Sequence, residues 1–173
     1  MKRNTLYIIL GFVLFVLSFL LVRSRPYPTT RPELYPVQVQ EAEQSKVAET
    51  ISNVIGWAKT KDLDLFYGSI ANDEDYISVT PGKRVIKRFE DVKQNVPFWM
   101  SPDFKYVRHE LKDLEIKFAR YGEVAWFFCI LDDINTYKGE PANWENTRWT
   151  GVVEKRDGKW VVVQQHFSFA GDK

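Results

Sequence analysis

The chain has 173 residues, enough for one domain with a sizeable core and an appended segment. Its formal net charge of +1 at pH 7 excludes the strong positive field typical of nucleic-acid-binding proteins. Aromatic residues make up 15% of the chain, which favours a β-rich domain with an aromatic-lined cavity or a broad interface, and a well-filled core would also account for most of them. The single cysteine, Cys129, excludes an internal disulfide.

The N-terminal segment contains an uncharged apolar run over residues 5–22. As a helix rising roughly 1.5 Å per residue, this run would extend about 27 Å, which is sufficient to cross the hydrocarbon core of a bilayer. A cleaved signal peptide is the alternative, but the run is long for one and no Ala-x-Ala site follows it. We therefore expect residues 1–25 to form a single-pass membrane anchor. A very short N-terminal tail more often stays in the cytoplasm, so we expect the domain on the non-cytoplasmic side.

A proline-rich segment follows the apolar run, and we assign residues 26–42 to a linker. It contains Pro26, Pro28, Pro32 and Pro36. Prolines favour an extended chain of about 3.1 Å per residue, so the segment would reach on the order of 40 Å. Such a spacer would hold a globular domain, residues 43–173, away from the membrane surface.

The first part of this domain has the patterning of helices. Residues 41–61 carry apolar side chains at helical spacing, which predicts an amphipathic helix. A second, short helix follows, for which Asp62 is a suitable N-cap. A short strand is predicted over residues 75–80, and a third helix over about 85–96, where Pro97 would end it.

From residue 104 onward the apolar pattern changes to period two, which is typical of strands. Two long strands are predicted, over residues 104–118 and 124–137. A terminal hairpin over residues 144–169 completes the sheet, with Asp157-Gly158 as the two-residue turn because this dipeptide readily adopts positive φ.

The register of the hairpin predicts which side chains share a face. Pairing outward from the turn places Thr150 opposite Gln165 and Arg148 opposite Phe167. On the last strand we place the more apolar set toward the core: Val161, Val163, Gln165, Phe167 and Phe169. The other face of the hairpin, which carries Trp149 opposite His166, is then the outer one.

Three helices followed by a meander of strands indicate an α+β fold. The segments Arg148-Trp149-Thr150-Gly151 and Gln165-His166-Phe167-Ser168, with the turn between them, resemble the SnoaL-like branch of the nuclear transport factor 2-like superfamily. The hairpin is also similar to the association domain of calmodulin-dependent kinases. The resemblance covers about residues 43–170. It implies a cone-shaped, cystatin-like α+β domain, in which a curved antiparallel sheet wraps around three N-terminal helices and encloses a cavity, and it implies dimers through the outer sheet face.

If the strand over residues 124–137 presents Trp126 and Asp132 to the cavity, a carboxylate lies among aromatic side chains. Its pKa would then rise, as a general base requires, and a salt bridge to Arg148 is the structural alternative. The predicted ligand-binding residues are Trp126, Asp132, Arg148, Thr150, Gln165 and Phe167. We assign no catalytic residue with these observations.

His166 is expected at a dimer interface with Trp149, because the register places both on the outer face. His109 lies in a charged segment and is expected to face solvent. The two histidines are too far apart in sequence for a metal-ligand pair, and the acidic residues 72–75 lack the spacing of a calcium loop. Cys129 is expected to be a buried, inert thiol. We therefore expect no metal, no cofactor and no nucleic-acid partner.

The sequence favours a membrane-anchored, non-catalytic module that binds a small apolar or amphipathic ligand or a protein partner. Two alternatives remain open. One is a SnoaL-like isomerase, cyclase or lyase that uses Asp132 as its base. The other is a structural subunit of a membrane assembly, in which the anchor helix packs against a membrane-protein partner.

Overall fold

The computed structural model describes residues 37–170. All of these residues belong to one structural unit, Tyr35–Lys173. The predicted anchor over residues 1–25 and most of the linker lie outside the described part. Between residues 37 and 170, none of the helices is long and apolar enough to cross a membrane.

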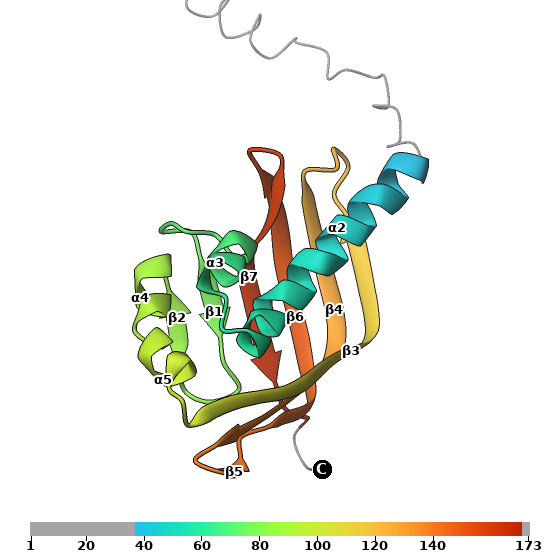
Figure 1. Ribbon diagram of the computed structural model, residues 1–173. Helices are drawn as coiled ribbons and strands as arrows, with labels where there is room; N and C mark the ends of the chain where they lie inside the picture. Colours follow the sequence, from blue (N-terminus) through green and yellow to red (C-terminus); the bar gives the residue numbers. More distant parts are fainter. Residues whose placement is uncertain (1–36, 171–173) are drawn as a thin grey trace, which may run out of the picture. The chain divides into compact units, whose positions relative to one another are not determined.

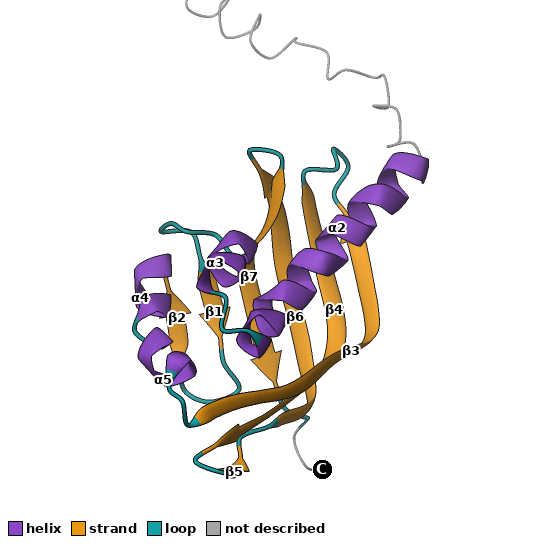
Figure 2. Ribbon diagram, viewed as in Figure 1, coloured by secondary structure: helices purple, strands orange, loops and turns teal. Residues whose placement is uncertain are grey.

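The described domain is an α+β fold in which helices lie against one face of a curved sheet (Figures 1 and 2). The helices are α2 (Val37–Gly56), the 3-10 turn η1 (Trp57–Lys59), α3 (Leu63–Ser69), α4 (Phe89–Lys93) and α5 (Val96–Met100). The strands are β1 (Ile77–Val79), β2 (Val85–Lys87), β3 (Phe104–Phe118), β4 (Val124–Tyr137), β5 (Glu140–Pro141), β6 (Trp144–Arg156) and β7 (Lys159–Ser168). The sheet order is β2-β1-β7-β6-β4-β3, with β5 paired to β4. All pairs are antiparallel except β1 with β7, which is parallel.

The long helix α2 packs on the sheet through an apolar stripe. Val47, Ile51 and Val54 lie at helical spacing and are buried. The predicted cap of the next helix is confirmed, since the Asp62 carboxylate accepts a hydrogen bond from the Leu65 N–H at 2.9 Å. The sheet therefore has a helix across its inner face, as the amphipathic pattern predicts.

The predicted third helix over residues 85–96 is wrong in its first part. Residues 85–87 instead form β2, which pairs with β1, and Arg88 has a φ of 74° that separates this strand from α4. Pro97 does not end a helix but lies in the first turn of α5, where its missing N–H costs no hydrogen bond. A strand pairing between two short segments therefore overrides the local helical spacing.

Strand β3 contributes strongly to the curvature of the sheet. Its pairing with β4 shifts register between Tyr106 and Arg108 and again between Lys112 and Glu115. Such bulges bend a strand and increase its twist. Figure 1 shows the result: β3 begins beside α5, its first half crosses the lower end of the sheet, and its second half turns upward beside β4. This bend closes one end of the space between sheet and helices.

The terminal hairpin has the predicted turn, with positive φ at Asp157 and Gly158. The predicted register holds from this turn to the pair Val153–Val162. Beyond that pair, Val152 faces Gln164 instead of the predicted Val163, because β7 contains one extra residue. The bulge moves every later pair by one position, so Trp149 faces Phe167 and Thr150 faces His166.

This bulge has two consequences for the core. Near the turn, Trp160 and Val162 point inward, whereas Val161 and Val163 were predicted to do so. After the bulge Gln165 and Phe167 point inward, as predicted. Position 151 of β6 requires a glycine, because a Cβ atom there would lie 2.5 Å from the ring of Phe127 on the neighbouring strand β4.

Candidate ligand-binding cavity

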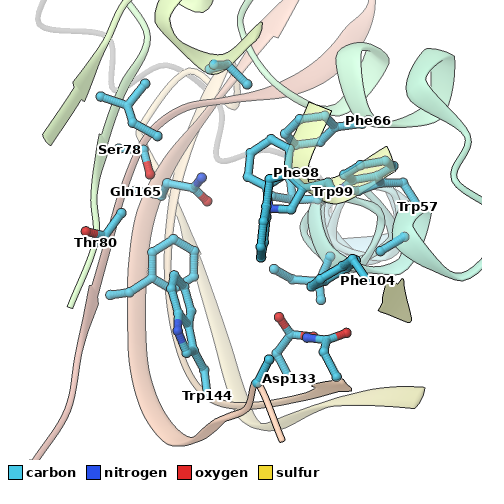
Figure 3. Close-up of a pocket in the computed structure, with 18 of the residues that line it drawn as sticks. Trp57, Phe66, Ser78, Thr80, Phe98, Trp99, Phe104, Asp133, Trp144 and Gln165 are labelled. Atoms are coloured by element: carbon cyan, nitrogen blue, oxygen red, sulfur yellow. The ribbon is translucent and has the colours of Figure 1, made fainter. Parts of the chain in front are cut away.

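A cavity of about 440 Å³ lies between the curved sheet and the helices (Figure 3). It is lined by residues of α2, η1, α3, α4, α5 and of strands β1 to β4 and β7, together with the segment around β5 and the start of β6. Its aromatic lining residues are Trp57, Phe66, Tyr76, Phe98, Trp99, Phe104, Trp144 and Phe167. Its polar lining residues are Ser78, Thr80, Asp133, Asn135, Asn143 and Gln165. This combination is typical of a small-molecule site, in which apolar walls carry a few placed polar groups.

The helical wall of the cavity is built from interlocked aromatic rings. Trp57 stacks on Phe66 with ring centroids 4.8 Å apart. Trp99 meets both rings edge-on, at 5.9 Å from Trp57 and 5.6 Å from Phe66. Rings held in these offset and edge-to-face arrangements have little freedom to collapse into the empty space. The cavity is therefore preformed.

The first polar group lies where β1 pairs with β7. Gln165 is opposite Ser78 in this parallel pair, and its Nε2 donates a hydrogen bond of 2.7 Å to the Tyr76 hydroxyl. Burial raises the pKa of Tyr76 to about 12, so the phenol stays protonated at neutral pH. The other amide atom, Gln165 Oε1, is buried and has no hydrogen-bond partner.

The second polar group lies at the far end of β4 and consists of Asp133 and Asn135. Burial raises the pKa of Asp133 to about 6, although a hydrogen bond from the Asn135 side chain lowers it in part. The Asn135 backbone is fixed by Asn143, whose Oδ1 accepts its N–H at 3.0 Å, and by Ala142, whose N–H donates to its carbonyl at 2.9 Å. Asn135 Oδ1 is buried without a partner. The cavity thus holds a carboxyl group that changes charge near pH 6.

Asp132 was the predicted cavity carboxylate, and this placement is wrong. Its side chain lies on the outer face of β4, 2.9 Å from Lys112 Nζ, and accepts the Asn146 N–H at 2.8 Å. These two hydrogen bonds hold the pKa of Asp132 below its usual value. Asp132 forms a salt bridge, but its partner is Lys112 and not the predicted Arg148.

The side of β4 that was predicted to point into the cavity points outward, and the opposite side points inward. Ala125, Phe127, Cys129 and Leu131 point into the core, whereas Trp126 and Phe128 are exposed on the outer face. Arg148 and Thr150 of β6, predicted as ligand-binding residues, are also exposed there. Of the six predicted ligand-binding residues, the structure brings Gln165 and Phe167 to the cavity and leaves Trp126, Asp132, Arg148 and Thr150 outside it.

Trp149, predicted on the outer face, is fully buried. Its ring stacks on Phe167 at 5.1 Å and meets Phe127 edge-on at the same distance. The face prediction is wrong, because the bulge in β7 shifts the pairing by one residue, and the expected dimer contact of Trp149 loses its geometric basis. His166 is exposed on the outer face, as predicted.

His109, expected to face solvent, instead joins β3 to α2. One ring nitrogen lies 3.0 Å from Ser52 Oγ and the other 2.9 Å from the Tyr106 hydroxyl. Burial lowers the pKa of His109. Cys129 is buried as predicted, and burial raises the pKa of its thiol to about 12, so it is not a reactive thiolate. Within residues 37–170, no group of three or more His, Cys, Asp or Glu side chains is arranged to hold a metal ion.

Among the polar residues that line the cavity, Gln165 alone was predicted; the six others are Tyr76, Ser78, Thr80, Asp133, Asn135 and Asn143. A usable signal exists for the carboxylate alone. In a strand, neighbouring residues point to opposite faces, so Asp132-Asp133 must place one carboxylate inside and one outside. The pair predicts a cavity carboxylate without telling which residue supplies it.

The SnoaL-like domain family matches residues 47–172, and the chain belongs to this family. One solved structure of similar fold is a candidate dehydratase of the NTF2-like family from Streptomyces avermitilis, with a TM-score of 0.64 at 15% identity over 77% of this chain and 99% of that chain. Another is an NTF2-like protein of unknown function in nutrient uptake from Rhodospirillum rubrum, with a TM-score of 0.58 at 19% identity over 72% and 98%. A third is a candidate calcium/calmodulin-dependent kinase II association domain from Exiguobacterium sibiricum, with a TM-score of 0.61 at 9% identity over 76% and 96%. At these identities the likeness shows the fold alone. No curated protein matches the sequence.

Proposed function

We propose that this SnoaL-like domain binds a small, largely apolar molecule in the cavity between its sheet and helices. The observation that carries the proposal is the preformed cavity of about 440 Å³ with its interlocked aromatic wall. In this proposal the segment over residues 1–25 anchors the protein in a membrane and the domain works on the non-cytoplasmic side.

The test compares two substitutions of the same kind. Ala142 and Ala119 are both half-buried and both lie just beyond a strand, but only Ala142 lines the cavity. In equilibrium dialysis with naphthalene, Ala142→Phe should weaken binding at least ten-fold because the new ring occupies the space, and Ala119→Phe should bind like wild type. Equal affinities of all three proteins would refute the proposal.

Acid–base catalysis is the second candidate function, and the pKa of Asp133 favours it. A carboxyl group that titrates near pH 6 inside an apolar cavity can accept a proton from a bound molecule at neutral pH and return it. The domain would then act as an isomerase or lyase, with Asp133 in the role that the sequence analysis gave to Asp132.

Its neighbour supplies a matched control. If the domain is an enzyme, Asp133→Asn should abolish turnover of the molecule identified in the cavity, whereas Asp132→Asn should keep it. The wild-type rate should rise as the pH passes about 6, the pKa of the carboxyl group. Full turnover by Asp133→Asn would exclude this role and leave ligand binding alone.

We further propose a homodimer through the outer sheet face. Trp126 and Phe128 are exposed on the outer face of β4, two positions apart. Phe128 pairs with Thr150 of β6, which in turn pairs with His166 of β7, so these side chains form one row across the sheet. Large apolar side chains gathered on one sheet face are typical of interfaces. In sedimentation, Trp126→Glu should give monomers, whereas Tyr121→Glu, at an even more exposed aromatic residue in the β3–β4 turn, should leave the dimer unchanged. A wild-type monomer would refute this proposal.

A further inference from the structure

We infer that the ligand of the cavity carries hydrogen-bond donors, with one hydroxyl or N–H group directed at Gln165 Oε1 and a second at Asn135 Oδ1. The inference rests on the proposed ligand-binding function and names the chemical class of the ligand: an aromatic molecule with hydroxyl or N–H groups, not a plain hydrocarbon. These two oxygens are the buried acceptors among the cavity-lining side chains that have no hydrogen-bond partner within residues 37–170.

Both side chains are held so that an acceptor is left over. Gln165 Nε2 donates a hydrogen bond to the Tyr76 hydroxyl, which holds the amide in place. The other amide atom, Oε1, then has no hydrogen-bond partner. The Asn135 side chain interacts with Asp133 and lowers its pKa, while the backbone N–H of Asn135 is bound by Asn143; Asn135 Oδ1 has no hydrogen-bond partner. Each residue is only 4% exposed, so bulk solvent does not satisfy these oxygens.

The chemistry of the free atoms decides the class of ligand. A buried carbonyl oxygen without a partner is unfavourable, and a ligand that donates a hydrogen bond to it removes this deficit. A ligand group that can only accept, such as an ether oxygen, meets the same oxygen with repulsion between lone pairs.

The two acceptors also set the separation of the donors. Gln165 comes from β7, beside β1, whereas Asn135 comes from the far end of β4, next to Asp133. Figure 3 shows Gln165 and Asp133 on different sides of the cavity, with the aromatic side chains of the helical wall facing the space between them. The ligand should therefore carry its two donors at separate positions on an apolar ring system.

Three probes of one ring system test the inference on the full-length protein: naphthalene, 2-naphthol and 2-methoxynaphthalene. The naphthol can donate a hydrogen bond, the methyl ether can only accept one, and the hydrocarbon does neither. In equilibrium dialysis we expect 2-naphthol to bind about ten-fold more tightly than 2-methoxynaphthalene, since a missing buried hydrogen bond has about this effect on an equilibrium constant.

Variants of Gln165 locate the effect. Gln165→Met removes the acceptor at similar length and should reduce the preference for naphthol over the ether by at least three-fold. Gln165→Glu keeps an acceptor and should keep the preference. Gln164→Met removes the neighbouring amide, which does not line the cavity, and should also keep it.

The outcomes separate this inference from the proposed function. If naphthalene, naphthol and the ether bind with equal affinity, the cavity binds ligands but the donor inference is refuted. If the preference exists and persists in Gln165→Met, the naphthol hydroxyl does not donate to Gln165 Oε1, and the assignment of a ligand donor to that oxygen is overturned. If none of the three probes binds, the proposed function itself fails. The wild-type comparison needs no variant, so it remains decisive if Gln165→Met does not fold.

Discussion

The substitution Asp133→Asn tests the electrostatics of the cavity through the stability of the domain. Burial raises the pKa of Asp133 from 3.8 to about 6, so the folded state binds its proton more tightly than the unfolded state does. The stability from this group is therefore fully present below pH 3.8 and is lost as the pH rises through about 6. One unit of pKa corresponds to about 1.4 kcal/mol, so the ionised carboxylate costs the fold on the order of 2–3 kcal/mol at pH 8.

Asparagine has nearly the same shape and carries no charge, so the variant should gain this free energy of unfolding at pH 8 relative to wild type. Urea unfolding at pH 4.5 and pH 8 measures it, and the gain should be much smaller at pH 4.5. Asp132→Asn is the control of opposite sign. The pKa of Asp132 is lowered by Lys112 and the Asn146 N–H, so its loss should destabilise the domain at pH 8 by about 1–3 kcal/mol. A gain for Asp133→Asn that does not change between the two pH values would refute the reasoning.

Three further substitutions have outcomes that the contacts determine. Trp149→Ala should lower the free energy of unfolding by about 3–5 kcal/mol, because the fully buried ring leaves a cavity in the core, and a fall below 1 kcal/mol in urea unfolding would contradict its burial. Burial lowers the pKa of His109, so wild type should lose stability as the pH falls below 6.5. In thermal unfolding between pH 5 and 7.5, His109→Gln should show a flatter dependence on pH than wild type, and an unchanged dependence would contradict this reasoning. Lys155, Lys46 and the Trp160 indole donate hydrogen bonds to the Glu43 carboxylate and lower its pKa to about 2. Glu43→Gln should therefore lower the free energy of unfolding by about 3 kcal/mol at pH 7. The difference in stability between wild type and this variant should shrink as the pH falls through 4.5 toward 2.

The strands and turns of this domain could be predicted from local patterns. The bounds 104–118 and 124–137 agree with β3 and β4, because each is a long run of strand-forming residues that ends at a turn. Asp157-Gly158 fixes its turn by backbone conformation alone. The wrong start of the helix predicted over residues 85–96 could not be recognised from the sequence. Its first three residues form a strand only because β1 lies beside them.

The faces of the strands were harder to predict, for a physical reason. Strand β4 is apolar on both faces, with Trp126 and Phe128 on one and Phe127 and Leu131 on the other, so hydrophobicity does not distinguish inside from outside. The bulge in β7 lies within the run 161–163, three valines in a row, where an extra residue leaves no trace in the pattern. One unrecognised residue then reverses the face of part of the strand.

The polar groups of the cavity depend on contacts between distant segments. Gln165 and Tyr76 are 89 positions apart and meet because β1 pairs with β7 in parallel. Asp133 reaches the cavity because the bulges of β3 curl the sheet. Neither contact leaves a local signal, so the sequence predicts that a cavity carboxylate exists but does not identify its partners.

The mass of the intact full-length protein tests the central claim most directly, namely that the inward cavity and not the outer sheet face is the ligand site. Native mass spectrometry of the protein purified without added small molecules should show a retained compound on wild type and on Trp126→Ala, and none on Ala142→Phe. A compound that remains on Ala142→Phe and disappears from Trp126→Ala would contradict the account and place the site on the outer face.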